Sequence, residues 1–388
     1  TAVKIEPHYQ NETVIYVKDA SRAVGVASSL LSEAQGVQFR QDIATEYVGV
    51  RELHAGKQSR KKFLSLEQAR ANRTPIDWSA YQPPQPQQLG LRVIDDIPLS
   101  ELVEYIDWTP FFQAWELAGR FPRILQDEVV GEEATKLYHD ARELLQQMVS
   151  QKQLRARAVY GFYPANSRDD DIVLYSSEAR NEELMVLHHL RQQNEKPPGK
   201  PNQCLADFIA PESSGLQDYL GAFAVTAGIG LDQIVEKFEA QLDDYSAIMA
   251  KALADRLAEA AAEWLHQKVR SEDWGYGADE QLDNEALIRE SYRGIRPAPG
   301  YPACPDHTEK ALLWTLIDPT ANAGISLTES YAMLPMAAVS GFYYSHPEAR
   351  YFGVGKIERD QVADYSRRKN ETQAYIERWL APVLNYDA

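Results

Sequence analysis

The order of strand-like and helix-like segments constrains the fold of this chain more than any other feature. Short runs of β-branched and aromatic residues follow one another in the middle of the sequence, a block of helical pattern comes next, and one more strand-like run stands near the end. This order differs from the regular strand–helix alternation of a doubly wound parallel sheet. It therefore predicts an α+β domain with a mainly antiparallel sheet.

The individual elements are predicted from periodicity and residue type. Helices are expected over residues 132–151 and within 231–270, where apolar residues recur at helical spacing and the length indicates two helices or one bent helix. Strands are expected over residues 156–163, 171–175, 184–190, 204–210, 219–226 and 337–344.

The beginning of the chain has a different pattern. Residues 13–17 are β-branched and aromatic, residues 19–21 form a turn and N-cap signal, and residues 24–31 are apolar at helical spacing. One strand–helix unit cannot close a sheet, so we expect it to be the last repeat of an α/β domain whose earlier strands are absent. Residue 1 is Thr and no secretory leader follows it, which we interpret as an excision point.

A proline-rich stretch separates the two patterns. Residues 72–89 contain four prolines among several glutamines and lack helical periodicity, which favours an extended surface linker. The predicted organisation is therefore a remnant of an α/β domain over residues 1–62, a linker over 63–89, and an α+β domain over 90–388.

Charge and cysteine content exclude several classes of protein. Lys and Arg total 40 against 57 Asp and Glu, a formal charge of −17 that argues against a general nucleic-acid or anionic-membrane binder. No apolar run approaches the ~18 residues of a membrane-spanning helix, so a soluble protein is expected. Cys204 and Cys304 are too few for a disulfide framework or a thiolate zinc site and are expected to be reduced thiols of a cytosolic protein.

The segment most suggestive of ligand binding is the proline-rich loop of residues 296–305. Its prolines fix the backbone, and Gly300 lets another group approach the main chain. Arg296 is suited to grip a carboxylate with two parallel hydrogen bonds, and Tyr301 offers a ring or a hydroxyl. From the pattern alone, a rigid surface connector with Arg296 in an ordinary salt bridge is the favoured reading.

The pattern alone gives ordinary structural roles to three acidic residues. Asp107 precedes Thr109-Pro110, where a helix is expected to begin, so it reads as a cap. Glu259 belongs to a row with Asp255 and Glu263 that normally marks a solvated helix face, and Glu290 has the same explanation. The pair His188-His189 lacks a metal-ligand set nearby and reads as structural.

An ordered series of segments resembles the activation domain of cobalamin-dependent methionine synthases. The resemblance runs from about residue 90 to the end of the chain, and residues 14–25 resemble the end of the cobalamin-binding domain of the same enzymes. The segments that carry it are IDWTPFF at 106–112, FPRIL at 121–125, HHLRQQ at 188–193, CLADF at 204–208, GAFAVT at 221–226, ALADRLAE at 252–259, GIRPAPGY at 294–301 and WLAP at 379–382.

The resemblance implies a C-shaped α+β fold that binds S-adenosylmethionine. It assigns Arg296 to the methionine carboxylate, Asp107 to the amino group, and Glu259 and Glu290 to the neighbourhood of the sulfonium. It also implies that the rest of the site is lined by Ala298, Gly300, Tyr301, Tyr351 and Phe352, and that Ala20 contacts cobalamin.

The resemblance also implies a function in reactivation. S-adenosylmethionine would give its methyl group to reduced cobalamin, with an electron from a flavodoxin-type donor, while the domain docks on the cobalamin-binding domain of the same cytoplasmic methyltransferase. Cobalamin would be held mainly by that other domain, because the cobalt-ligating Asp-x-His-x-x-Gly motif is absent from this sequence. Zinc would belong to the homocysteine domain, which lies outside this chain together with the folate domain.

Two other readings compete with this one. A noncatalytic S-adenosylmethionine-binding regulatory module would bind the ligand without presenting it to cobalamin. A free-standing methyltransferase acting on a small molecule is disfavoured by the lack of a glycine-rich first strand–helix turn.

Overall fold

The chain forms two compact units in a computed structural model that describes residues 1–9, 13–17, 20–32, 34–58 and 62–387. The first unit is Thr1–Leu64 and the second is Ser65–Ala388. The interpretation of the first unit as a cobalamin-domain remnant, and of residues 63–89 as a linker, stays a prediction.

The first unit is helical. It contains the 3-10 turn Glu6–His8, α1 (Ala20–Leu31) and α2 (Gly36–Gln58). The helix expected at residues 24–31 is confirmed within α1, whereas Asp19 of the predicted cap lies outside the described residues. The strand expected at residues 13–17 is wrong, because these residues are irregular and no described strand pairs with them. Extended backbone becomes a strand only when a neighbouring strand satisfies its N–H and C=O groups.

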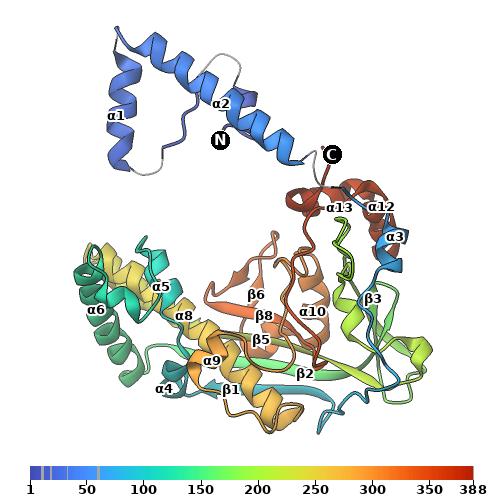
Figure 1. Cartoon of the computed structure of the whole chain (residues 1–388). Coiled ribbons are helices and arrows are strands. Elements are labelled where there is room, and N and C mark those ends of the chain that lie inside the picture. The colour runs from blue at the N-terminus through green and yellow to red at the C-terminus, as the bar shows by residue number, and fades with distance from the viewer. Residues whose placement is uncertain (10–12, 18–19, 33, 59–61, 388) are drawn as a thin grey trace. The chain divides into compact units, whose positions relative to one another are not determined.

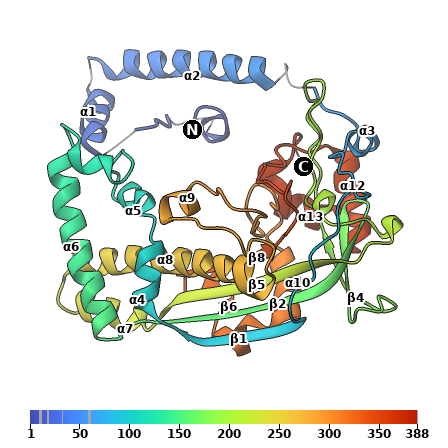
Figure 2. The same cartoon turned by 60° about the horizontal axis from the view of Figure 1, so that its bottom comes forward.

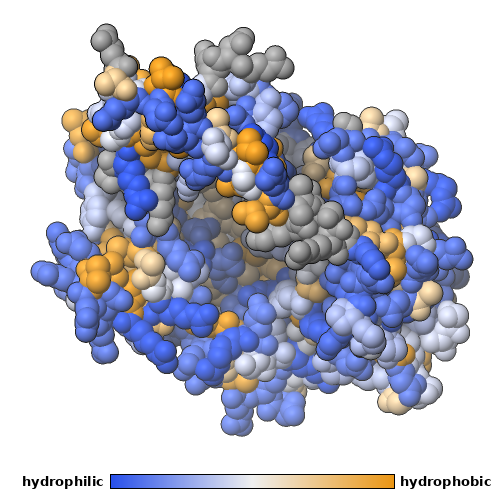
Figure 3. Space-filling view, turned by 45° about the horizontal axis from the view of Figure 1, so that its top comes forward, coloured by the Kyte–Doolittle hydropathy of each residue, from blue (hydrophilic) through white to orange (hydrophobic). Residues whose placement is uncertain are grey.

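Apolar side chains of the first unit are left on its surface. Val24, Leu31 and Leu53 are 70%, 84% and 69% exposed. Figure 3 shows orange hydrophobic patches on a face of the molecule that is otherwise mainly hydrophilic. Two helices alone therefore do not bury the apolar residues that this part of the sequence carries.

The second unit is built on a six-stranded antiparallel sheet. Its strands run in the order β4-β3-β2-β5-β8. β1 and β3 both pair with the edge of β2 that faces away from β5. The strands are β1 (Gly90–Ile97), β2 (Arg155–Arg168), β3 (Asp171–Tyr175), β4 (Glu183–His188), β5 (Asp218–Ile229) and β8 (Ala338–Tyr343). A separate small hairpin joins β6 (Ser326–Leu327) to β7 (Met333–Leu334). The predicted α+β class and antiparallel sheet are confirmed.

Helices surround this sheet. Figure 1 shows α5, α6 and α8 at one end of the unit and α3, α12 and α13 at the other. Figure 2 shows that both groups rise on one side of the sheet, which gives this unit a C shape. The helices are α3 (Leu66–Ala71), α4 (Leu99–Leu102), α5 (Thr109–Ala114), α6 (Gly131–Ser150), α7 (Leu231–Glu239), α8 (Asp244–Lys268), α9 (Asn284–Ile288), α10 (Glu309–Ile317), α11 (Pro319–Ala323), α12 (Arg359–Lys369) and α13 (Gln373–Leu380).

Both faces of the sheet are buried. Side chains alternate between the faces along a strand, so on β2 Ala158 and Tyr160 join the core under α6 and α8, while Val159 joins the core that contains residues of α10. On β5 every residue except the last is buried. This explains why the predicted central strands are continuous apolar runs rather than alternating ones.

Most predicted elements of this unit are confirmed, but one predicted strand is absent and one strand of the main sheet was not predicted. Residues 204–210 form a 3-10 turn, Leu205–Phe208, instead of a strand, because buried Asp207 accepts hydrogen bonds from the Cys204 N–H and from Arg191 at 2.7–3.1 Å. The other difference is β1, which was not predicted. Only one face of β1 meets the core, and the charged residues of the strand obscure its alternation of apolar and polar side chains.

The proline-rich segment lies on the second unit. The Trp274 indole N–H donates to the Pro84 carbonyl at 2.8 Å, and the Gln87 N–H donates to the Asp273 carbonyl at 3.0 Å. In α3, Arg70 pairs with Asp170 and Asp364. No helix in the described part of the chain is both long enough and apolar enough to cross a membrane.

Candidate functional site

The loop that begins at Arg296 extends the sheet beyond β8. Ile295 exchanges two backbone hydrogen bonds with Tyr344, and the Pro297 carbonyl accepts the Phe342 N–H at 2.9 Å. The chain then turns at Gly300, where φ is +96° and the N–H donates to the Cys304 carbonyl. The backbone of this loop is thus fixed at its root by the sheet and at its tip by a tight turn.

Arg296 turns its side chain toward α8 and uses one nitrogen for three contacts. Its Nη1 lies 2.7 Å from the Glu263 carboxylate, donates to the Tyr292 hydroxyl at 2.8 Å, and lies 3.2 Å from His266 Nδ1. Among the described residues, Nη2 and Nε of Arg296 have no hydrogen-bond partner, and the side chain keeps 18% of its surface exposed. The free edge of the guanidinium has the geometry that receives a carboxylate.

The residues that hold Arg296 were not predicted as a site. Glu263 was read as part of a solvated face, which is wrong for this residue because only 7% of it is exposed. His266 is fully buried, with its ring stacked on Tyr343 at 5.2 Å. Burial, followed by the charges of Arg270 and Arg296, lowers the pKa of His266 well below its usual value. A neutral His266 accepts the Arg296 N–H through Nδ1, and a helical row of Glu, His and Arg at 263, 266 and 270 is the sequence signal for this arrangement.

Glu259 and Glu290 are electrostatically linked to Arg296. Burial raises the pKa of both carboxyls. The positive charge of Arg256, followed by that of Arg296, partly opposes the shift at Glu259, and that of Arg296 partly opposes it at Glu290. Glu259 lies on α8, whereas Glu290 follows α9 with a φ of +55°. Carboxylates with raised pKa values next to a guanidinium are typical of functional sites rather than of a solvated helix face.

Asp107 lies one residue before the N-cap of α5, which is Trp108. Its carboxylate accepts the N–H of Thr109, the first residue of α5, at 2.9 Å, so it satisfies an N–H of the first turn without being the N-cap residue that the pattern predicted. The preceding residues lie beside the elements of the site, because the Tyr105 hydroxyl donates to Gln267 on α8 and Asn284 on α9 donates to the Ile106 carbonyl. No hydrogen bond or ion pair joins Asp107 to Arg296 in the described part of the chain, so its role toward an amino group stays a prediction.

The remaining predicted lining residues differ in exposure. Tyr301 is 59% exposed, and burial together with the negative charge of Glu259 raises its pKa. The Tyr351 hydroxyl accepts the backbone N–H of Arg296 at 3.0 Å and is thereby held at the site. Ala298 is half-buried, and the ring of Phe352 lies 6.5 Å from that of Phe208 in the core behind the loop.

Ala20, the residue predicted to contact cobalamin, is the first residue of α1, but its side chain lies outside the described part of the structure, so this contact stays a prediction. Among the described residues, no group of three or more His, Cys, Asp or Glu side chains is arranged to hold a metal ion. Cys204 and Cys304 are free thiols buried in the core, and burial raises the pKa of each.

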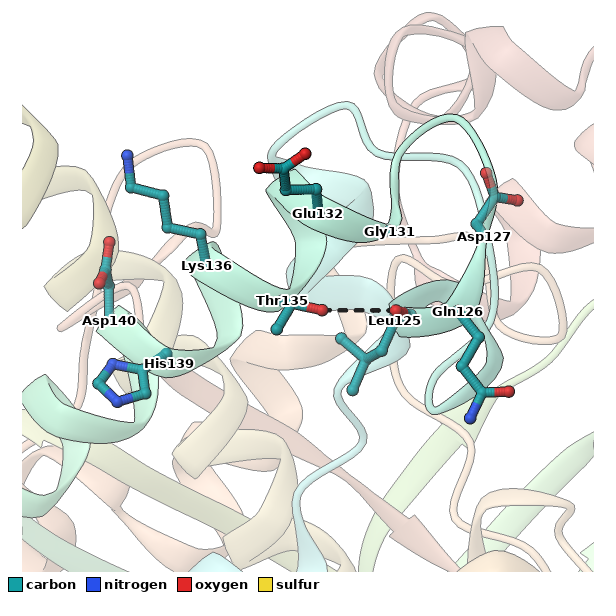
Figure 4. A pocket seen from close by; sticks show the side chains of 9 residues that line it. All are labelled: Leu125, Gln126, Asp127, Gly131, Glu132, Thr135, Lys136, His139 and Asp140. Atoms are coloured by element: carbon teal, nitrogen blue, oxygen red, sulfur yellow. Dashed lines mark hydrogen bonds between the residues drawn. The ribbon is translucent and has the colours of Figure 1, made fainter.

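A separate cavity of about 580 Å³ lies at the start of α6, and none of the predicted site residues lines it. Figure 4 shows Glu132, Lys136 and His139 projecting from α6 beside the turn at Leu125, whose carbonyl accepts the Thr135 hydroxyl at 3.4 Å. These side chains are mixed in charge and solvated, which is ordinary for the outer face of a helix.

Comparisons with known proteins agree with the resemblance. The family model described as "Vitamin B12 dependent methionine synthase, activation domain" matches residues 98–370. A crystal structure of the MetH reactivation domain bound to AdoHcy is 55% identical in sequence and superposes with a TM-score of 0.81. The match covers 84% of this chain and 99% of that chain. The chain therefore belongs to the family of activation domains of vitamin B12-dependent methionine synthases.

Proposed function

We propose that this chain binds S-adenosylmethionine beside Arg296 and presents its methyl group to reduced cobalamin held by the cobalamin-binding domain of the same cytoplasmic enzyme. The electron that keeps cobalamin reduced would come from a flavodoxin-type donor. In this proposal the chain is the reactivating part of a methyltransferase, and Asp107 and Ala20 contact the ligand amino group and cobalamin, respectively.

One observation carries the proposal: the Nη2 and Nε edge of Arg296 is left unpaired at a partly exposed position while Nη1 is fixed by three protein groups. This is the arrangement that binds an α-carboxylate with two parallel hydrogen bonds. Two carboxyls, Glu259 and Glu290, lie within electrostatic reach of the same guanidinium and supply the negative charge that a sulfonium ligand needs. The related reactivation domain was crystallised with AdoHcy, the demethylated form of this ligand.

Methyl transfer requires little from the protein beyond holding the reacting groups in position. Reduced cobalamin would supply the electron pair that forms the new bond to the methyl carbon, while the carbon–sulfur bond would break with its electron pair remaining on sulfur and leave the neutral thioether S-adenosylhomocysteine. No proton moves, so no general base is required. The side chains of the site have to hold the methyl carbon in line with its acceptor and exclude competing water.

The two glutamates are expected to serve binding more than the chemical step. Positive charge leaves sulfur as the methyl group departs, so a carboxylate stabilises the sulfonium of the bound ligand more than the transition state. Glu259→Gln and Glu290→Gln should therefore weaken S-adenosylmethionine binding while single-turnover methyl transfer at saturating ligand changes little. Loss of methyl transfer with unchanged affinity would contradict this role.

Calorimetry with S-adenosylmethionine tests the binding site directly. Arg296→Ala should weaken affinity by about tenfold to a hundredfold, because a charge-assisted bidentate contact is lost. Arg142→Ala, which removes an exposed arginine of α6, is the matched control and should bind as the parent does. Equal affinity in the parent and the Arg296→Ala variant would refute the assignment.

A noncatalytic regulatory module is the competing function. Mixing the chain with separately made cobalamin-binding domain, a chemical reductant and methyl-labelled S-adenosylmethionine distinguishes the two. Label appearing on cobalamin supports reactivation. Binding without any transfer of label supports the regulatory reading.

A further inference from the structure

A carboxylate on α8, that of Glu263, lies between the guanidiniums of Arg296 and Arg270. Glu263 on α8 is 7% exposed, Oε2 lies 2.7 Å from Arg296 Nη1, and Oε1 lies 3.5 Å from Arg270 Nη1. Residues 263, 266 and 270 share one face of the helical segment, since they are three and four positions apart. A charge this deeply buried is stable only when it is paired.

The distances show which of the two arginines is the main ion-pair partner of Glu263. Arg270 is fully buried and already has a carboxylate of its own, because its Nε lies 2.9 Å from Glu280. Its guanidinium carbon also lies 4.3 Å from the centre of the Tyr292 ring. In the described part of the chain, no carboxylate other than Glu263 forms a hydrogen bond or ion pair with Arg296. Among these residues, Glu263 is therefore the ion-pair partner of Arg296.

The contact also fixes the direction in which Arg296 points. Glu263, Tyr292 and His266 all meet the same nitrogen, Nη1, from α8 and from the segment before the loop. An arginine side chain loses rotamer freedom when it is ordered, and a ligand that has to order it binds more weakly. Tyr292 and His266 are neutral acceptors, so among these three contacts only Glu263 holds the guanidinium through charge.

We propose that Glu263 is a positioning residue for ligand recognition: its carboxylate fixes Nη1 of Arg296 so that the Nη2 and Nε edge is presented to the α-carboxylate of the ligand. This inference rests on the proposed function. It predicts an effect that depends on the ligand carboxylate, which a merely structural role of Glu263 would not produce.

The experiment measures binding of two probes to the full chain by calorimetry. S-adenosylmethionine carries the α-carboxylate, and decarboxylated S-adenosylmethionine lacks it but keeps the amino group and the sulfonium. Glu263→Gln should weaken binding of S-adenosylmethionine by about tenfold or more and change binding of the decarboxylated probe by less than about twofold. In the Arg296→Ala background the same substitution should have no further effect on either probe.

The matched control removes a different buried carboxylate. Glu309 on α10 is fully buried, pairs with Lys369 and accepts the His188 N–H, so these contacts are separate from the Arg296 cluster. Glu309→Gln should lower thermal stability, and it should not change the affinity for one probe relative to the other. If Glu263→Gln does not fold, Glu263→Asp keeps the charge on a side chain shorter by one methylene and should weaken only S-adenosylmethionine binding.

The outcomes separate this inference from the proposed function. If Arg296→Ala weakens S-adenosylmethionine binding but Glu263→Gln does not, or weakens both probes equally, the positioning role is refuted and the binding site stands. An additive loss in the double variant also refutes it. If the parent and Arg296→Ala bind equally, the proposed function fails and the positioning role fails with it.

Discussion

At the residue scale, the raised pKa values of Glu259 and Glu290 make ligand discrimination depend on pH. As pH falls from about 8 toward the raised pKa values, these carboxyls take up protons, and the sulfonium of S-adenosylmethionine loses nearby negative charge. S-adenosylhomocysteine carries no sulfonium, so its affinity should change less. We expect the preference for S-adenosylmethionine over S-adenosylhomocysteine, measured by calorimetry, to decrease with falling pH.

The same experiment has a control on the neighbouring helix. Glu259→Gln should flatten the pH dependence, whereas Glu285→Gln, which removes a carboxyl with 76% of its side chain exposed, should leave it unchanged. A preference that is constant over pH in the parent would contradict an electrostatic role of Glu259.

His346 provides a second residue-scale prediction, for stability. Its ring is 3% exposed and packs 4.9 Å from Trp78 and 4.5 Å from Tyr81, and burial followed by the charge of Arg293 lowers its pKa to about 4. Below its usual pKa of about 6.5 the unfolded chain binds a proton that the folded chain does not, so stability is lost as pH falls toward 4.

His346→Phe should remove this loss. Denaturant unfolding at several pH values should show that the free energy of unfolding of the parent falls relative to the variant by about 2 kcal/mol between pH ~7.5 and pH ~5. The constant part of the difference, which includes the lost hydrogen bond from the Glu348 N–H, does not affect this slope. A difference that is independent of pH would mean that His346 titrates normally in the folded protein.

At the element scale, the loop of residues 296–305 depends on a glycine. Gly300 has a φ of +96°, and a Cβ built on it would lie 2.3 Å from the His307 ring. Gly300→Ala should therefore lower the free energy of unfolding by about 2–3 kcal/mol and weaken S-adenosylmethionine binding, because both the backbone and the packing of the loop are disturbed.

Gly199 separates the two causes. It also has a positive φ, of +78°, but a Cβ there meets nothing within 4 Å. Gly199→Ala should cost only the backbone strain of about 1 kcal/mol and leave ligand binding unchanged. Equal costs at the two positions would mean that His307 moves aside without penalty.

At the scale of the whole molecule, the predicted S-adenosylmethionine site lies entirely in the unit Ser65–Ala388. A chain that starts at Ser65 should bind S-adenosylmethionine with the affinity of the full chain, within about twofold. Starting at Arg73 removes α3, whose Arg70 pairs with buried Asp170 and whose Leu66 is buried. This shorter chain should lose more than about 2 kcal/mol of stability.

Arg70→Ala in the full chain identifies the cause of that loss. It breaks the ion pairs with Asp170 and Asp364 but keeps α3 in place. If this variant and both truncations are as stable as the parent, α3 does not support the second unit. Reduced ligand affinity on removal of residues 1–64 would show that the site extends into the first unit.

The sequence by itself determined the antiparallel sheet, the long helices and the segments that resemble the family, because these are encoded in local periodicity and in continuous runs of residues. The loop at Arg296 was also visible, since its prolines act locally. The strand expected at residues 204–210 was wrong because a distant charge, Arg191, captures Asp207.

The tertiary structure alone decided which polar residues hold Arg296 in place. Glu263 and His266 lie on a helix whose exposed and buried faces cannot be told apart until the sheet and the loop pack on it. The row of acids therefore resembled a solvated face, although Glu263 is paired with an arginine more than thirty positions away in the chain. Pairing and burial depend on long-range contacts, whereas a sequence pattern reports only on neighbours along the chain.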